Sequence, residues 1–190
     1  MQQFGLASLA MYYYDFREEE KQDLHGLLSS VLFQLCGQSY SYYEILSAFY
    51  ETYHDGAQIP NNDELIRCLK DLLKLPGQAP VYLIVDALDE CPNTPLPSHR
   101  DQVLVFLEDL VDSKLPNLRI CVTSLTEIDI KSTIEPLAFR SILLHEESRQ
   151  KEDINNYIKS VVNTDRNMRR WKSEHKQLVI DVLTERADGM

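Results

Sequence analysis

Three carboxylates follow an apolar run of the sequence within five positions. The run is Val81–Val85, and the acids after it are Asp86, Asp89 and Glu90. A carboxylate at the mouth of a dry cleft can hold Mg²⁺ on a phosphate, directly or through water. Three acids after a strand can also be a solvated loop that caps the next helix. The spacing alone leaves both interpretations open.

The residues around these acids indicate the element that carries them. Val81–Val85 has no polar break and is bounded by Gly77–Pro80 and Cys91–Pro92, which is typical of a strand buried on both faces of a parallel sheet. Open parallel sheets bind ligands at the carboxyl ends of their strands. We therefore expect the acids at a ligand-binding edge of a sheet.

Strands and helices alternate along the rest of the chain, which predicts an α/β fold. Short aromatic or β-branched segments predict further strands at Leu9–Phe16, Arg119–Thr123 and Ser141–His145. Apolar residues at three- and four-residue steps predict helices between these strands and after residue 148. The helices are expected from Asp23 to Gly37, from Ser41 to Tyr53, from the cap Asn62 to Leu73, from the capping pair Ser98 and Asp101 to Val111, and from Ile128 to Ile134.

Composition and charge exclude several classes of function. Of the 190 residues, 44% are hydrophobic and 26% are charged, which is ordinary for a globular chain. The net charge of −11 argues against a nucleic-acid partner, and no apolar run is long enough to cross a membrane. The cysteines lack metal-ligand spacing, so buried free thiols in a reducing, cytoplasmic compartment are expected. These are Cys36, Cys68, Cys91 and Cys121.

Val81–Glu90 resembles the Walker B segment of the NACHT family of P-loop NTPases, a class of signal-transduction ATPases. That family has an apolar strand, an Asp, a tiny residue, an apolar residue and two acids, and all of these positions match. Tyr13–Arg17 and Ile120–Ser124 are similar to the second strand and the sensor-1 strand of its fungal, nephrocystin-like branch. Glu152–Ile158 and Ala187–Met190 resemble the start of its helical region.

The resemblance implies a fold and a division of the chain. Residues 1–147 would form an incomplete nucleotide-binding core, a three-layer P-loop NTPase of the RecA/ASCE-like type. Residues 148–190 would form the start of a helical lid. The resemblance further implies binding and hydrolysis of ATP or GTP with Mg²⁺.

The family also implies roles for single residues. Asp86 would hold Mg²⁺, and Asp89 and Glu90 would orient or deprotonate the attacking water. Thr123 and Ser124 would form hydrogen bonds to that water or to the γ-phosphate. Each of these side chains could instead be a cap or a structural acid, since hydroxyls and carboxylates at strand ends often bond nearby backbone.

Three features depart from the family pattern. No glycine is followed by Lys, so the phosphate-binding loop Gly-x-x-x-x-Gly-Lys-Ser/Thr does not occur, and Leu125 stands where the family usually has Arg. The sequence also stops at Gly189–Met190, where the family continues into the lid. Without the strand that precedes the loop, the edge at Arg119–Thr123 would be unpaired. A truncated piece of a longer protein is therefore expected, in preference to a self-sufficient degenerate domain.

Two functions from different classes remain. The first is the Walker B and sensor-1 half of a NACHT-type signalling NTPase, weak or inactive by itself. Its partners would be a nucleoside triphosphate, other domains of a longer chain and further copies in a homo-oligomer. The second is a non-catalytic interaction domain that keeps the fold without the chemistry.

Overall fold

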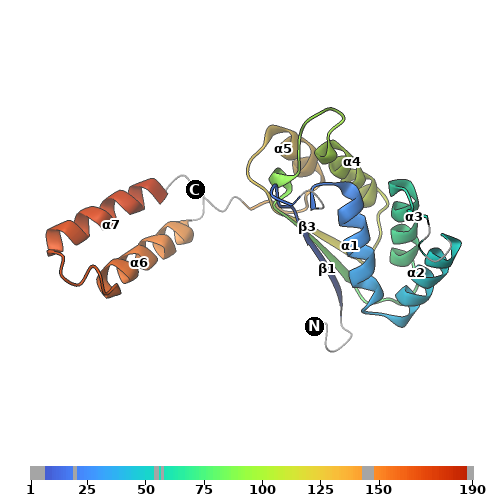
Figure 1. The fold of residues 1–190 in the computed structure, drawn as a ribbon, viewed down its shortest axis with the longest axis horizontal. Helices are drawn as coiled ribbons and strands as arrows, with labels where there is room; N and C mark the ends of the chain where they lie inside the picture. The colour runs from blue at the N-terminus through green and yellow to red at the C-terminus, as the bar shows by residue number, and fades with distance from the viewer. Residues whose placement is uncertain (1–6, 19–20, 54–55, 57, 143–147, 188–190) are drawn as a thin grey trace. The chain divides into compact units, whose positions relative to one another are not determined.

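A computed structural model describes residues 7–18, 21–53, 56, 58–142 and 148–187 (Figure 1). The chain divides into two compact units, Met1–Ala138 and Phe139–Met190. In order, the elements are β1 (Ser8–Tyr13), α1 (Leu24–Cys36), α2 (Tyr40–Thr52), α3 (Asn62–Leu73), β2 (Val81–Asp86), the 3-10 helix η3 (Leu88–Glu90), α4 (His99–Asp112), β3 (Leu118–Val122), α5 (Ile128–Ile134), the 3-10 helix η4 (Glu135–Leu137), α6 (Ser148–Thr164) and α7 (Ser173–Ala187).

The described strands form one parallel sheet in the order β1-β2-β3. Val81 pairs with Ser8 on one side and with Leu118 on the other, so the strand that carries the acids is central. Tyr13 pairs with Asp86 at the carboxyl end of the same ladder. The predicted α/β class with a parallel sheet is confirmed, and the three strands end at a common edge.

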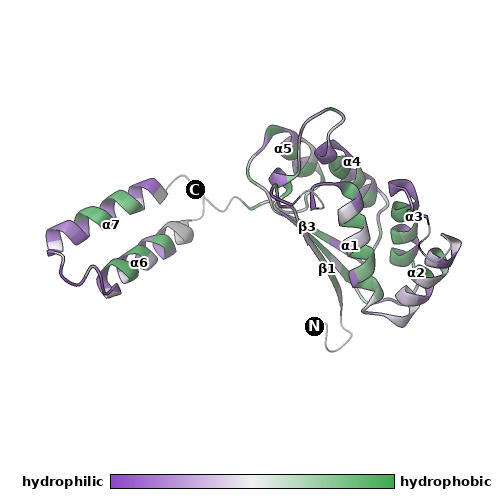
Figure 2. Ribbon diagram, viewed as in Figure 1, coloured by the Kyte–Doolittle hydropathy of each residue, from purple (hydrophilic) through white to green (hydrophobic). Residues whose placement is uncertain are grey.

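Helices α1, α3 and α4 pack on one face of this sheet and form the hydrophobic core with it. Leu83 and Val85 of β2 are buried against apolar residues of these helices, of which Leu27, Leu69 and Phe106 are almost wholly enclosed. Figure 2 shows the hydrophobic residues along α1 and α3. The core fixes the position of β2 and therefore of the acids at its end.

The opposite face of the sheet is open among the described residues, so the prediction that β2 is buried on both faces is wrong. Burial alternates along β2. On the open face, the side chain of Tyr82 in β2 is 43% exposed and that of Met11 in β1 is 46% exposed. The physical reason is the handedness of the crossovers. Strand order advances in one direction from β1 to β3, and successive right-handed crossovers in one direction place their helices on the same face.

The helix caps confirm one prediction and correct another. Ser98 and Asp101 form a reciprocal capping box at the start of α4, as the sequence predicts. Asn61, not Asn62, caps α3: its side chain accepts from the Glu64 N–H at 3.0 Å, and its own N–H donates to the Glu64 carboxylate at 2.8 Å. The prediction was one residue late because only Asn61 has a glutamate three residues on.

The second unit contains a helical hairpin of α6 and α7, in which Val162 and Ile180 are buried. The strand predicted at Ser141–His145 falls mainly outside the described residues, and Ser141 and Ile142 are not in a strand. Within the described part of the chain, every helix is too short or too polar to cross a lipid bilayer.

The cysteines are free thiols, as expected, but they are not all buried. Cys68 and Cys91 are enclosed in the core, and burial raises the pKa of their thiols to about 11 and about 12. Cys121 is exposed because it lies on β3 at a position that faces away from the helices. The prediction of burial is therefore wrong for Cys121.

Candidate functional site

The acids lie on a tight turn at the carboxyl end of β2. Asp86 is the last residue of the strand, and Asp89 and Glu90 lie in η3 directly after it. Ala87 joins the two elements in the left-handed backbone region, with φ 54° and ψ 47°. This conformation costs a residue with a Cβ about 1 kcal/mol, so the turn is held by its surroundings.

Thr123 holds the turn against β3. Its hydroxyl donates to Oδ1 of Asp86 and accepts from the N–H of Ala87 at 3.1 Å. Its carbonyl accepts from the N–H of Leu88 at 3.0 Å. The structure therefore brings Asp86 and Thr123 together at the ends of adjacent strands. Ser124 is exposed, and no hydrogen bond of its side chain to a described residue is found.

Asp89 and Glu90 accept hydrogen bonds from the segments that follow the two strands beside β2. Oδ1 of Asp89 accepts from the N–H of Leu125 beyond β3 at 2.8 Å. Oε2 of Glu90 accepts from the N–H of Phe16 beyond β1 at 3.2 Å. The acids thus tie the ends of three adjacent strands together. One oxygen of each carboxylate remains without a hydrogen bond to the described residues.

Arg100 supports the turn from the protein interior. It is only 6% exposed and donates to the carbonyl of Asp89 at 2.6 Å and to that of Cys91 at 2.9 Å. Its third contact is an ion pair with Asp129 of α5 at 3.2 Å. Sequence reasoning missed this residue, because a single arginine in the first turn of an amphipathic helix looks like a surface charge.

A second arginine lies at the end of β1, on the same edge of the sheet. Arg17 makes a bidentate ion pair with Asp15, at 2.7 and 2.8 Å. Hydrogen bonds from Arg17 lower the pKa of Asp15 to about 2. The hydrogen bonds to Asp15 raise the pKa of Arg17, and the nearby carboxylate of Glu90 adds to this rise. The guanidinium of Arg17 is therefore committed to Asp15.

The oxygen donors at this edge fit Mg²⁺ in the manner of phosphate-bound magnesium. The described residues contain no group of three or more His, Cys, Asp or Glu that could enclose a metal ion. Mg²⁺ usually keeps several waters and binds one or two carboxylates together with substrate phosphates. Oδ2 of Asp86 is available for this, since the hydroxyl of Thr123 occupies Oδ1.

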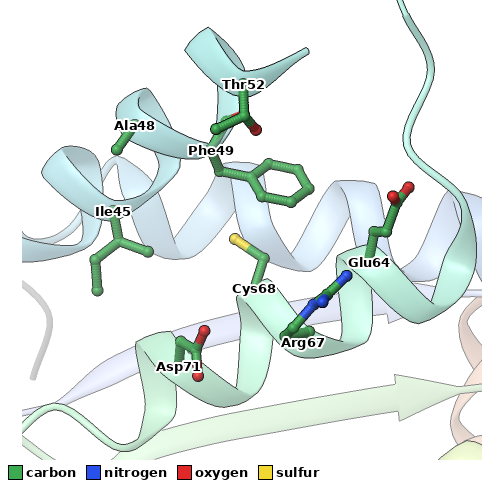
Figure 3. Close-up of a pocket in the computed structure, with 8 residues that line it drawn as sticks. All are labelled: Ile45, Ala48, Phe49, Thr52, Glu64, Arg67, Cys68 and Asp71. Atoms are coloured by element: carbon green, nitrogen blue, oxygen red, sulfur yellow. The ribbon is translucent and has the colours of Figure 1, made fainter.

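An open crevice lies elsewhere, between α2 and α3 (Figure 3). Its volume is about 260 Å³, and its lining mixes apolar side chains such as Phe49 with charged ones such as Arg67 and Asp71. None of its lining residues belongs to a strand end. The crevice is therefore separate from the cluster of carboxylates.

The three described strands are parallel and carboxylates follow the central one, so the domain is of the α/β class with acidic residues at the carboxyl edge of its sheet. The sequence model of one family, described as nephrocystin 3, N-terminal, matches residues 2–124. The chain belongs to this family, which confirms the nephrocystin-like branch of the resemblance. The match runs from before β1 to Ser124 and so includes the ends of all three strands. No curated protein and no solved structure matches the chain.

Proposed function

We propose that this domain binds a nucleoside triphosphate with Mg²⁺ at the carboxyl edge of its sheet, as the Walker B and sensor-1 half of a NACHT-type P-loop NTPase. One observation carries the proposal. Asp86 and Thr123, predicted for these two motifs from separate parts of the sequence, lie at adjacent strand ends and share a hydrogen bond. Membership of the nephrocystin 3 N-terminal family supports it.

The residues have distinct roles in this proposal. Asp86 holds Mg²⁺, which when bound neutralises charge on the phosphates. Asp89 and Glu90 orient the attacking water through the carboxylate oxygens that their backbone partners leave available. Thr123 and Ser124 form hydrogen bonds to the water or to the γ-phosphate. The nucleotide is ATP or GTP.

The affinity of these 190 residues by themselves is expected to be weak. The sequence has no Gly-Lys-Ser/Thr loop, whose N–H groups and lysine bind the β- and γ-phosphates. Leu125 offers no guanidinium at the sensor-1 position, and Arg17 is engaged by Asp15. We therefore expect a dissociation constant on the order of 1 mM, with complete dependence on the metal.

A second function is a non-catalytic interaction domain, and one observation favours it. Asp86, Asp89 and Glu90 each accept a hydrogen bond from a segment next to β2. Acids used in this way would be retained to hold the strand ends together even if no nucleotide were bound. If the domain is non-catalytic, these three acids should still contribute to folding stability, and the domain should bind no nucleotide.

Isothermal titration with Mg·ATP and Mg·GTP separates the two functions. The variants are Asp86→Asn, which keeps an acceptor for Thr123 but removes the charge, and the matched control Asp112→Asn on the exposed end of α4. We expect magnesium-dependent heat from the wild type and the control, and none from Asp86→Asn. Absence of binding in the wild type, or equal binding by Asp86→Asn, would reject the proposed site.

A further inference from the structure

The outer edge of β1 is paired with side chains of α1 and of the turn that follows it, in place of a strand. The carboxamide of Gln38 accepts from the N–H of Leu9 at 2.8 Å and donates to its carbonyl at 2.6 Å. The carboxamide of Gln34 accepts from the N–H of Met11 at 3.0 Å and donates to its carbonyl at 2.8 Å. Each glutamine thus reproduces the two bonds that a neighbouring strand would make to one residue.

The spacing of the two glutamines explains why both pairs of hydrogen bonds form. Four residues of an α-helix rise by about 6 Å, and two residues of a parallel strand by about 6.6 Å. Gln34 lies in α1 and Gln38 in the turn directly after it, and the helical backbone of the cap Gly37 (φ −70°, ψ −5°) carries this spacing on to Gln38. The two carboxamides therefore meet alternate strand residues, whose N–H and C=O point the same way. Gln34 is held in place by Ser30 at 3.0 Å, and Gln38 by the carbonyl of Gln34 at 2.8 Å.

The opposite edge of the sheet differs. The N–H of Thr123 points to the carbonyl of Val85 in β2, so alternation directs the N–H groups of Ile120 and Val122 away from β2. No side-chain hydrogen bond to either group is found in the described part of the chain. The sheet therefore has one edge occupied by carboxamides and one without such cover.

We propose that Gln34 and Gln38 act as a substitute strand that closes the β1 edge to pairing with another polypeptide. An unpaired edge is a template for strand addition, and apolar side chains beside it increase the hazard. Leu9 and Met11 are 37% and 46% exposed on the open face of the sheet, so the β1 edge has this character. A strand that added to β1 would first have to displace four hydrogen bonds.

Amide hydrogen exchange and sedimentation velocity test this role. In Gln34→Leu/Gln38→Leu, we expect the amides of Leu9 and Met11 to exchange about tenfold faster than in the wild type, the factor expected for the loss of one hydrogen bond. The amide of Ala10, on the β2 side of the strand, should be unchanged. The double variant should also self-associate at concentrations at which the wild type and the exposed control Gln102→Leu keep their size.

Shorter substitutions protect the test against a general loss of folding. Gln34→Asn should release only the amide of Met11, and Gln38→Asn only that of Leu9, because each keeps a carboxamide that falls one methylene short. A general loss of stability cannot produce this crossed pattern. Unchanged exchange at both amides, or no self-association by a double variant in which both amides are released, would overturn the proposal.

Discussion

The hydroxyl of Thr123 donates a hydrogen bond to Oδ1 of Asp86 and joins the carboxyl ends of β3 and β2. The same hydroxyl accepts from Ala87, whose left-handed backbone turns the chain into η3. The contact therefore has two consequences. It stabilises a strained turn, and it holds the carboxylate proposed to bind Mg²⁺ at a defined place on the sheet edge.

Thr123→Val should lower the free energy of unfolding by about 1 to 2 kcal/mol, because Asp86 and the N–H of Ala87 both lose a hydrogen-bond partner. Thr123→Ser keeps the hydroxyl and should lose less than half of this. Urea denaturation followed by circular dichroism measures both values. Equal stability of the valine and serine variants would show that the contact contributes nothing to folding.

Arg100→Met should destabilise the domain by about 2 to 4 kcal/mol. The carbonyl of Cys91, which is buried, and that of Asp89, which is partly buried, would lose their donors, and Asp129 would lose its cation. Asp129→Asn should cost less, since it leaves both carbonyl contacts in place. The exposed Arg119→Met serves as the control. Chemical denaturation should rank the three in this order, and a small effect of Arg100→Met would contradict the support that we assign to it.

Stability should fall in acid through the pair of Asp15 and Arg17. The pKa of Asp15 is lowered from 3.8 to about 2, so the folded chain binds fewer protons than the unfolded chain between these values. The contribution is therefore fully present above about pH 4 and is lost as the pH falls towards 2. Thermal unfolding from pH 2 to 6 should show a shallower loss in Arg17→Gln than in the wild type. Parallel curves would contradict the lowered pKa.

Much of the frame could be predicted from local sequence signals. The unbroken run Val81–Val85 and the β-branched segment at Arg119–Thr123 indicate two strands, and the acids after the first indicate its carboxyl end. Ser98 with Asp101 marked a helix start because a capping box depends on residues three positions apart. Such signals are short in range, so they can be read without knowing the tertiary structure.

Features that depend on distant packing could not be predicted. An apolar run does not reveal whether a second layer covers it, so Tyr82 was expected to be buried. Arg100 is buried only because α4 meets the turn after β2 and the start of α5. Gln34 and Gln38 have the polarity of solvated residues at the end of a helix, and only the position of β1 beside them gives them partners.

Paramagnetic broadening by Mn²⁺ with ATP would show where the metal binds, since Mn²⁺ accepts the same oxygen ligands as Mg²⁺. We predict that the amide signals of Ala87, Leu88 and Thr123 broaden first, that excess Mg²⁺ restores them, and that Asp86→Asn abolishes the effect. Broadening that is centred on another part of the chain, or that persists unchanged in Asp86→Asn, would show that the end of β2 is not a metal–nucleotide site.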